Sequence, residues 1–278
     1  MDSHRGGHRP SKRLGQNFLL DHGIAEQIVS SISPGSSDTV LEPGPGHGTL
    51  TRLLIEKAGR VIAIEKDPRL VNELRDTFRN HPNLTIVEGD VLKMGDSLPA
   101  FNKLASTPPY YISSKLTLLL TKKTFDIAAV VFQKEFGERL LAEPGTANYG
   151  RLTVMARRKL DVEKIRDISK VMFSPRPKVD SSFLRLTPRQ PITELDEVLL
   201  EELVRGIFTQ RRRLLKSALA HFLGLKYGRE VGKDLLGRLS LPDARVYQLS
   251  IAQLENLSLQ LWRVVSDRIV SGGLKARN

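Results

Sequence analysis

Short apolar runs alternate with amphipathic segments through the first half of the chain. Ile24, Ile28 and Ile32 recur at helical spacing, which is typical of the buried face of a helix. Apolar runs bounded by turn residues predict buried strands. The expected strands are 39–42, 60–65, 84–87, 103–105 and 127–133, and the expected helices are 22–32, 49–57, 67–78 and 114–122. This alternation predicts a parallel sheet with crossover helices.

The pattern changes near two prolines, Pro188 and Pro191. Helical spacing continues after them to the end of the chain, interrupted by glycine and proline near 224–232 and at Pro242. Further strand candidates before them are 151–160, 165–171 and 182–186. We therefore expect an α/β domain with a Rossmann-like sheet over residues 1–189 and a small α-helical domain over 190–278.

The composition is that of a globular protein, since 278 residues with 40% hydrophobic content can fill a sizeable core. No apolar run of about 18 residues predicts a membrane span, and the basic start, Met1–Arg13, lacks the apolar stretch of a secretory signal. The absence of cysteine excludes disulfides and thiolate metal sites and is compatible with a cytoplasmic protein. The histidines lack metal-binding spacing, so we expect no metal.

Basic residues dominate both ends of the chain. The formal net charge is +12, above the roughly 2–8 of many small soluble domains. Residues 201–278 hold 14 Lys and Arg against 7 Asp and Glu, a net charge of +7. The first 16 residues add Arg5, Arg9, Lys12 and Arg13. A solubilising surface is the plainer interpretation, but an excess of this size favours nucleic acid as partner.

A glycine-rich turn follows the first strand of the expected sheet. It reads Glu42-Pro43-Gly44-Pro45-Gly46-His47-Gly48. Glycines at this place let the backbone approach a ligand closely and tighten the strand-to-helix turn. The turn departs from the three-glycine dinucleotide pattern, and taken alone it would also fit a purely structural role.

Two acidic residues end the next two strands. Glu65 lies 21 residues after Gly44, where an acid can accept hydrogen bonds from ribose hydroxyls. Asp90 ends the third strand, where a carboxylate can accept from an adenine amino group. Either acid alone would be interpreted as a helix cap or a solvated loop residue. Because the turn and both acids fall on one rim of the sheet, together they predict a pocket for an adenosine-bearing cofactor.

Thr107-Pro108-Pro109-Tyr110 follows the fourth strand on the same rim. An exocyclic amine is a poor nucleophile because its lone pair is delocalised into the ring, and acceptors aimed at its N–H groups localise that lone pair. Rigid prolines would hold the Thr107 hydroxyl and a backbone carbonyl in position, with Ser106 as an alternative acceptor. Tyr110 offers a face for a flipped base. Standing alone, the motif would be a Pro-Pro turn with a packing tyrosine.

Over nearly its whole length the chain resembles the ribosomal RNA adenine dimethyltransferase family, specifically the universal small-subunit members. Each motif is modest, but their order and spacing together are specific. The motifs are Gly15-Gln16-Asn17-Phe18-Leu19, Val40-Leu41-Glu42-Pro43-Gly44-Pro45-Gly46, Glu65-Lys66-Asp67, Glu88-Gly89-Asp90, Pro109-Tyr110-Tyr111-Ile112-Ser113-Ser114, Phe173-Ser174-Pro175-Arg176-Pro177-Lys178-Val179-Asp180-Ser181 and Phe208-Thr209-Gln210-Arg211-Arg212-Arg213.

The resemblance implies S-adenosylmethionine as cofactor in a methyltransferase domain. Glu65 is expected to hold the ribose hydroxyls, Asp90 the adenine and Gly44 the methionine part, while Asn17 and Leu19 close the site. The full set of expected cofactor-binding residues is Asn17, Leu19, Gly44, Gly46, Glu65, Asp90 and Thr107.

The resemblance also implies a site for the target adenine. Tyr110 and Phe173 are expected to sandwich the base, so that with Thr107 they form the catalytic set. The family usually has Asn where this chain has Thr107, whose hydroxyl reaches less far and is a weaker acceptor. The implied reaction is direct methyl transfer to adenine N6, repeated to give N6,N6-dimethyladenine.

A basic cluster marks the helical domain. Arg211, Arg212 and Arg213, with Lys216, fall on an expected helix. The ordinary interpretation of such a run is a solvated helix face. Because it lies in the net-basic domain, we prefer contact with the phosphates of a folded RNA.

We therefore expect a cytoplasmic, monomeric enzyme that dimethylates small-subunit ribosomal RNA in a pre-ribosomal particle during ribosome biogenesis. Two alternatives stay open: an adenine methyltransferase of large-subunit rRNA, and a non-catalytic nucleic-acid-binding assembly factor that keeps the fold. The 175–181 motif and the length of the helical domain favour the small-subunit branch. The intact cofactor residues disfavour a pure binder, whereas Thr107 keeps it open.

Overall fold

The computed structural model describes residues 14–190 and 195–270. The basic side chains expected near the start, Arg5, Arg9, Lys12 and Arg13, lie outside the described residues. The chain divides into two compact units. Unit 1 is Met1–Leu141 with Leu160–Arg189, and unit 2 is Ala142–Lys159 with Gln190–Asn278.

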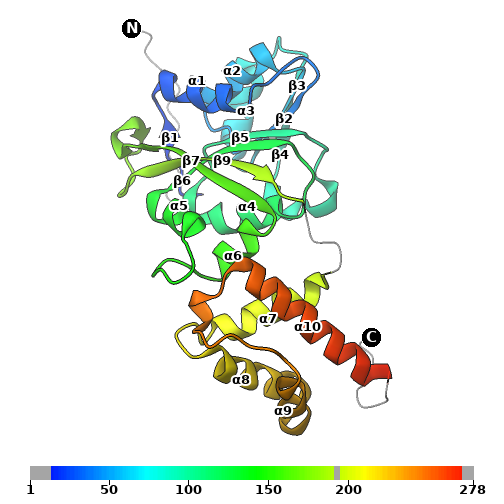
Figure 1. Ribbon diagram of the computed structural model, residues 1–278. Coiled ribbons are helices and arrows are strands. Elements are labelled where there is room, and N and C mark those ends of the chain that lie inside the picture. The colour runs from blue at the N-terminus through cyan, green and yellow to red at the C-terminus, as the bar shows by residue number, and fades with distance from the viewer. Residues whose placement is uncertain (1–13, 191–194, 271–278) are drawn as a thin grey trace. The chain divides into compact units, whose positions relative to one another are not determined.

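Unit 1 is built on a seven-stranded sheet (Figure 1) with the order β4-β3-β2-β5-β6-β9-β7. Neighbouring strands from β4 to β6 are parallel, whereas β9 is antiparallel to both of its neighbours. The strands are β2 (Thr39–Pro43), β3 (Arg60–Glu65), β4 (Leu84–Glu88), β5 (Lys103–Ser106), β6 (Ile127–Gln133), β7 (Leu160–Ile168) and β9 (Ser181–Pro188). The expected α/β, Rossmann-like sheet is confirmed.

Helices cover both faces of this sheet (Figure 1). The helices α1 (His22–Ser31), α2 (Thr49–Lys57) and α3 (Pro68–Thr77) lie on one face, and α4 (Ser113–Leu120) and α5 (Lys134–Leu141) on the other. Local sequence sets the helix starts: Asp21 caps α1, and Asp67 caps α3 with Pro68 in its first turn. Central strands such as β6 are buried along most of their length, which explains their continuous apolar runs.

The order of strands reverses beside β2. From β2 the chain builds β3 and β4 on one side, and then β5 and β6 on the other. The crevice outside the carboxyl ends of strands at such a reversal is where ligands bind in open α/β sheets. A small second sheet pairs β1 (Phe18–Leu19) with β8 (Phe173–Ser174) in antiparallel register.

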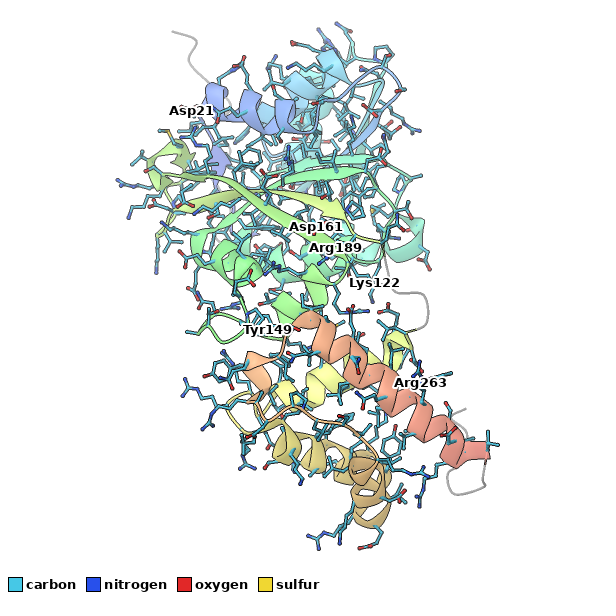
Figure 2. The ribbon with its side chains drawn as sticks, in the orientation of Figure 1. Asp21, Lys122, Tyr149, Asp161, Arg189 and Arg263 are labelled. Atoms are coloured by element: carbon cyan, nitrogen blue, oxygen red, sulfur yellow. The ribbon has the colours of Figure 1, made fainter. Side chains whose placement is uncertain are left out.

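Unit 2 is helical in its C-terminal part, as the sequence predicts. Its helices are α6 (Arg151–Arg157), α7 (Glu197–Phe208), α8 (Leu215–Tyr227), α9 (Arg229–Gly237) and α10 (Ile251–Val270). They enclose an apolar core that includes the fully buried Tyr149, whose hydroxyl donates to the Leu249 carbonyl at 2.8 Å (Figure 2). Across both described ranges, no helix combines the length and apolar character that a membrane span requires.

The structure differs from the sequence expectation at residues 151–160. Residues 151–157 form α6 rather than a strand, and β7 begins only at Leu160. Thr153 accepts a hydrogen bond from the Gly150 N–H in the first turn of α6. The helix buries Val154 and Ala156. Val154 packs in the apolar core of unit 2, to which the segment Ala142–Lys159 belongs. The sequence predicted a single boundary near residue 190, which would place this segment in the first domain. In the structure the segment Ala142–Lys159 belongs to unit 2.

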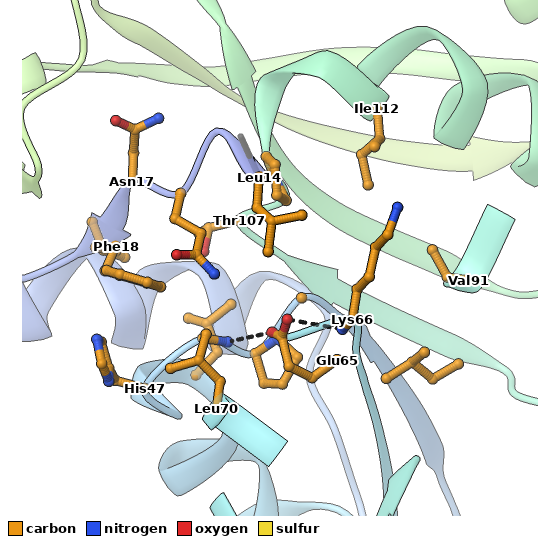
Figure 3. A pocket seen from close by; sticks show the side chains of 18 of the residues that line it. Leu14, Asn17, Phe18, His47, Glu65, Lys66, Leu70, Val91, Thr107 and Ile112 are labelled. Atoms are coloured by element: carbon orange, nitrogen blue, oxygen red, sulfur yellow. Dashed lines mark hydrogen bonds between the residues drawn. The ribbon is translucent and has the colours of Figure 1, made fainter. Parts of the chain in front are cut away.

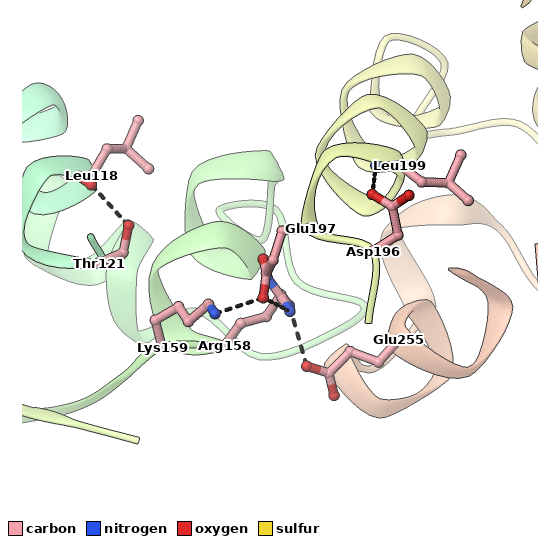
Figure 4. A network of polar contacts seen from close by, with 8 residues as sticks. All are labelled: Leu118, Thr121, Arg158, Lys159, Asp196, Glu197, Leu199 and Glu255. Carbon is pink, nitrogen blue, oxygen red and sulfur yellow. Dashed lines mark hydrogen bonds and ion pairs between the residues drawn. The ribbon is translucent and has the colours of Figure 1, made fainter. Parts of the chain in front are cut away.

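Arg158 fixes the segment within unit 2 (Figure 4). Its side chain is almost fully buried, and its guanidinium donates to Glu197 at 2.9 and 3.3 Å and to Glu255 at 3.2 Å. Lys159 also pairs with Glu197 at 2.6 Å. A buried cation requires such compensation, so carboxylates distant in sequence hold this segment in place.

Candidate functional site

The glycine-rich turn joins β2 to α2 at the reversal of strand order. Gly44 and Gly46 have φ angles of 69° and 61°, in the left-handed region that residues with a Cβ rarely adopt. A Cβ on Gly46 would lie 2.7 Å from the Phe18 ring. The turn therefore places bare backbone beside the crevice, where a ligand can approach it closely.

Glu65 connects this turn to the end of β3 (Figure 3). One carboxylate oxygen accepts from the N–H groups of Lys66 and Asp67 at 2.8 and 2.9 Å, and the other accepts from the Gly46 N–H at 3.2 Å. Burial raises the pKa of Glu65, although these backbone hydrogen bonds oppose the shift. A carboxylate held in this way is a preorganised acceptor at the edge of the crevice.

Asp90 forms the second acidic edge of the crevice. Its oxygens accept from the Leu92 N–H at 3.1 Å and from the Lys66 ammonium at 2.9 Å. Burial acts to raise the pKa of Asp90, but the hydrogen bonds from Lys66 and Leu92 hold it below its usual value. Asp90 is therefore a charged acceptor whose present partner, Lys66, is itself half-exposed.

The segment 14–19, which ends with β1, lines the same crevice. The Gln16 amide donates to Asp67 at 3.1 Å, and the Phe18 ring lies 4.3 Å from the His47 ring. The Thr49 hydroxyl donates to the Leu19 carbonyl at 3.2 Å. These contacts tie the segment to the glycine-rich turn and to the start of α3.

All seven residues expected to bind the cofactor line one pocket of unit 1. They are Asn17, Leu19, Gly44, Gly46, Glu65, Asp90 and Thr107. They come from separate stretches of the chain that meet at the carboxyl ends of β2, β3, β4 and β5. With two carboxylates at its edge and glycine backbone at its base, the pocket suits a ligand that donates hydrogen bonds.

Thr107 and Ser106 have different environments. The Thr107 side chain lines the pocket, and its hydroxyl makes no hydrogen bond with any residue of the described ranges. Ser106 is fully buried, and its hydroxyl donates to the Pro43 carbonyl at 2.5 Å. Ser106 does not line the pocket, and its hydroxyl joins β5 to β2, so Thr107 is the better placed of the two; the alternative acceptor at Ser106 stays a prediction.

The two aromatic residues expected at the target base do not line this pocket. Tyr110 is half-buried and shares a hydrogen bond of 2.7 Å with the Ser181 hydroxyl, and burial raises its pKa. Phe173 is 4% exposed and packs in the hydrophobic core. Tyr111, which follows Tyr110, does line the pocket and is 56% exposed. The aromatic sandwich stays a prediction.

The arginine run of unit 2 is not on a helix, contrary to expectation. The helix α7 ends at Phe208 and α8 begins at Leu215, so Arg211, Arg212 and Arg213 lie in the connecting turn. The cause is a non-local contact. The N–H groups of residues 246 and 247 donate to the carbonyls of Arg213 and Arg211 at 3.1 and 3.0 Å.

The four cations predicted to bind RNA also differ in exposure. The Arg211 guanidinium donates to the Ala147 and Thr146 carbonyls at 2.9 and 3.1 Å and lies 5.6 Å from the centre of the Tyr247 ring. The side chains of Arg212, Arg213 and Lys216 are exposed. Arg211 therefore holds the turn together, and the other three cations face solvent.

Sequence reasoning did not assign several residues that line the pocket, chiefly Gln16, Phe18, His47, Lys66 and Tyr111. All five stand beside expected site residues in the quoted motifs, and that adjacency was the available signal. Within residues 14–190 and 195–270, no group of three or more His, Asp and Glu side chains could hold a metal ion.

A largely parallel sheet with a glycine-rich turn at its reversal, and acids ending the next two strands, together with the similar solved structures, defines a methyltransferase of the Rossmann-like class. A family model described as "Ribosomal RNA adenine dimethylase" matches residues 7–232 of the chain. This chain belongs to the ribosomal RNA adenine dimethylase family.

Relatives and solved structures agree with this assignment. A protein of Thermococcus kodakarensis named "Probable ribosomal RNA small subunit methyltransferase A" is 45% identical over 246 residues, which cover 87% of this chain and 86% of the relative. A dimethyladenosine transferase from Plasmodium falciparum superposes with a TM-score of 0.79 at 29% identity, covering 89% of this chain and 98% of that one. The 23S rRNA methyltransferase ErmE superposes with a TM-score of 0.63 at 29% identity, covering 90% of this chain and 99% of that one.

Proposed function

We propose that this protein transfers methyl groups from S-adenosylmethionine to the N6 amino group of adenines in small-subunit ribosomal RNA, twice on each target base. The observation that carries the proposal is the meeting of seven expected cofactor residues in one pocket at the reversal of strand order. The names of the relatives support the small subunit as the source of the substrate.

The pocket residues fit S-adenosylmethionine. Each carboxylate oxygen can accept two hydrogen bonds. Three of these four acceptor sites of Glu65 are taken by backbone N–H groups, so one remains for a ribose hydroxyl, and a second hydroxyl would share an oxygen with a backbone partner. Asp90 would accept the adenine amino group in place of the Lys66 ammonium. When bound, S-adenosylmethionine supplies an electrophilic methyl group on a sulfonium centre, which is a good leaving group, so no covalent enzyme intermediate is needed.

The residues after β5 orient the target amine. The Thr107 hydroxyl, with no partner among the described residues, accepts one amine N–H, and a backbone carbonyl of the Pro108-Pro109 turn accepts the other. Tyr110, paired through its hydroxyl with Ser181, supplies a ring face for the base, opposite Phe173. Catalysis then comes mainly from positioning the amine in line with the methyl group.

Unit 2 binds the RNA. Arg212, Arg213 and Lys216 contact phosphates, and Arg211 keeps the turn in the shape that presents them. The substrate is a precursor of the small ribosomal subunit, the working form is a monomer, and the compartment is the cytoplasm, where the enzyme serves ribosome biogenesis.

The two alternatives make different predictions. A large-subunit enzyme is disfavoured by the lower TM-score of ErmE, 0.63 against 0.79 at equal identity. A non-catalytic assembly factor has no need for an intact pocket with two acceptor carboxylates. The discriminating experiment is calorimetric titration with S-adenosylmethionine, followed by transfer of radiolabelled methyl to undermethylated small and large ribosomal subunits in parallel. We expect cofactor binding and label in the small subunit alone; label in the large subunit alone, or none, would reject the proposal.

A further inference from the structure

The hairpin of α8 and α9 encloses a groove whose floor is partly bare backbone. The two helices lie side by side (Figure 1) and are joined at Gly228. A Cβ on Gly232 would lie 2.9 Å from the Gly224 nitrogen, so the helices approach at backbone distance. A Cβ on Gly224 would meet nothing within 4 Å, and both glycines line the groove. No side chain therefore covers the groove at Gly224.

Three basic side chains line this groove: His221 from α8, and Arg229 and Lys233 from α9. All three are exposed. None makes a hydrogen bond or ion pair with any residue in the part of the chain that the structure describes. Arg229 and Lys233 are four positions apart, so their side chains share a helix face with about 5–6 Å between Cβ atoms.

Two other cations near the groove, Lys226 on α8 and Arg268 on α10, are neutralised. Lys226 pairs with Glu202, and Arg268 pairs with Asp234, the residue that follows Lys233. Neither Asp234 nor Glu230 lines the groove. Over residues 211–238 the sequence holds eight Lys and Arg against two Asp and Glu. Uncompensated positive charge gathered in a concave surface attracts an anionic ligand.

We propose that the α8–α9 groove binds the sugar–phosphate backbone of the RNA substrate, as a contact separate from the Arg211–Arg213 turn. The groove has no Phe, Tyr or Trp, and the only ring that lines it is the imidazole of His221. Phosphates rather than stacked bases are therefore its main contacts. It also lacks the buried aromatic anchors that dominate protein interfaces, which favours RNA over an acidic protein. This inference rests on the proposed function.

A double substitution, Arg229→Gln with Lys233→Gln, tests the groove in the full-length protein. The matched control is Arg238→Gln with Arg263→Gln, which removes the same charge from exposed residues of unit 2 that do not line the groove; Arg263 is labelled in Figure 2. Binding to undermethylated small subunits is measured across a series of KCl concentrations. Two lost phosphate contacts should lower the salt slope by about 1.4–1.8, while the control keeps the wild-type slope and both keep the wild-type melting temperature.

Equal slopes for the groove variant and the control would overturn the proposal. The wild-type protein separates this failure from that of the proposed function. If the wild type binds and methylates small subunits while the groove variant keeps its slope, only the groove proposal fails. If the wild type neither binds nor methylates them, the proposed function fails first.

The absence of cysteine from the chain permits a direct second test. A photo-crosslinker attached to Ala220→Cys, an exposed residue that lines the groove, should attach to ribosomal RNA. The same reagent on Ala252→Cys, an exposed position on α10 outside the groove, should not. Crosslinks only to ribosomal protein, or equal yields at both positions, would contradict RNA as the occupant.

Discussion

At the scale of single residues, Glu65 joins the end of β3 to two other parts of the pocket. Its carboxylate binds the backbone of the glycine-rich turn at Gly46 and the backbone at the start of α3. Because its remaining acceptor capacity faces the pocket, one side chain both shapes the site and offers it a ligand contact. Its substitution should therefore affect cofactor binding before it affects the fold.

We predict that Glu65→Ala weakens S-adenosylmethionine binding and leaves RNA affinity nearly unchanged. Losing charge-assisted hydrogen bonds of about 1.5–3 kcal/mol should cost roughly 10- to 150-fold in affinity. Isothermal titration calorimetry measures this effect. Glu88→Ala is the matched control, because Glu88 ends the neighbouring strand but does not line the pocket. Equal affinity of the Glu65 variant and the control would mean that the pocket is misplaced.

Thr107 and Tyr110, in the segment after β5, should contribute unequally to methyl transfer. We expect Tyr110→Ala to lose most activity, because stacking a base on an aromatic ring gains about 1–3 kcal/mol and a misplaced amine adds to the loss. Tyr110→Phe, which removes only the bond to Ser181, should retain more activity. Thr107→Val should cost less than Tyr110→Ala but remain measurable in single-turnover assays at saturating cofactor. A silent Thr107→Val would make the threonine structural, and a silent Tyr110→Ala would exclude the ring from base binding.

Glu42 gives the fold a dependence on pH. The side chain is fully buried and accepts a hydrogen bond from the Thr51 hydroxyl at 2.7 Å, and burial raises its pKa from 4.5 to about 8. Between these values the folded chain keeps a proton that the unfolded chain has lost. The contribution of Glu42 to stability is therefore complete below about pH 4.5 and is lost as the pH rises through about 8.

We predict that Glu42→Gln, which keeps the shape and an acceptor oxygen, removes this loss. The free energy of unfolding of the variant should fall less than that of the wild type between about pH 5 and pH 8. Urea denaturation at several pH values measures both slopes. Parallel profiles would show that Glu42 does not titrate in this window.

At the scale of elements, local patterns predicted the parts of the chain whose partners are close in sequence. Buried strands such as β6 and capped helices such as α3 follow from apolar runs and from Asp67-Pro68. The Arg211–Arg213 turn could not be predicted, because carbonyl contacts with residues 246 and 247 end the helix there. The same reason applies to α6, whose buried face is covered by residues distant in sequence.

The arginine turn yields a prediction that separates fold from binding. Arg211→Gln should lower the melting temperature by several degrees, because two hydrogen bonds to the Thr146 and Ala147 carbonyls are lost. Arg213→Gln should leave the melting temperature unchanged and lower the salt slope of ribosome binding by about 0.7 to 0.9. Calorimetric melting and binding at several salt concentrations measure both. If both variants melt alike, Arg211 has no structural role.

At the scale of the whole molecule, the chain passes between its two units three times, after Leu141, Lys159 and Arg189. Unit 2 is therefore not a simple C-terminal addition, since Arg158 and Tyr149 enter its core from the middle of the chain. The cofactor residues could be predicted because parallel strand ends meet at one rim. The burial of Phe173, one of the two aromatic residues expected at the target base, could not be predicted from the sequence. Its strand pairs with Leu19, which is distant in sequence.

The reaction proposed for this protein forms N6,N6-dimethyladenine in small-subunit ribosomal RNA. The most direct measurement is mass spectrometry of nucleosides from undermethylated small subunits incubated with the protein and S-adenosylmethionine. We predict the appearance of N6,N6-dimethyladenosine, absent when cofactor is omitted and strongly reduced with the Glu65→Ala variant at limiting cofactor. Small-subunit RNA that stays unmodified, while large-subunit RNA or no RNA gains methyl groups, would contradict the proposed function.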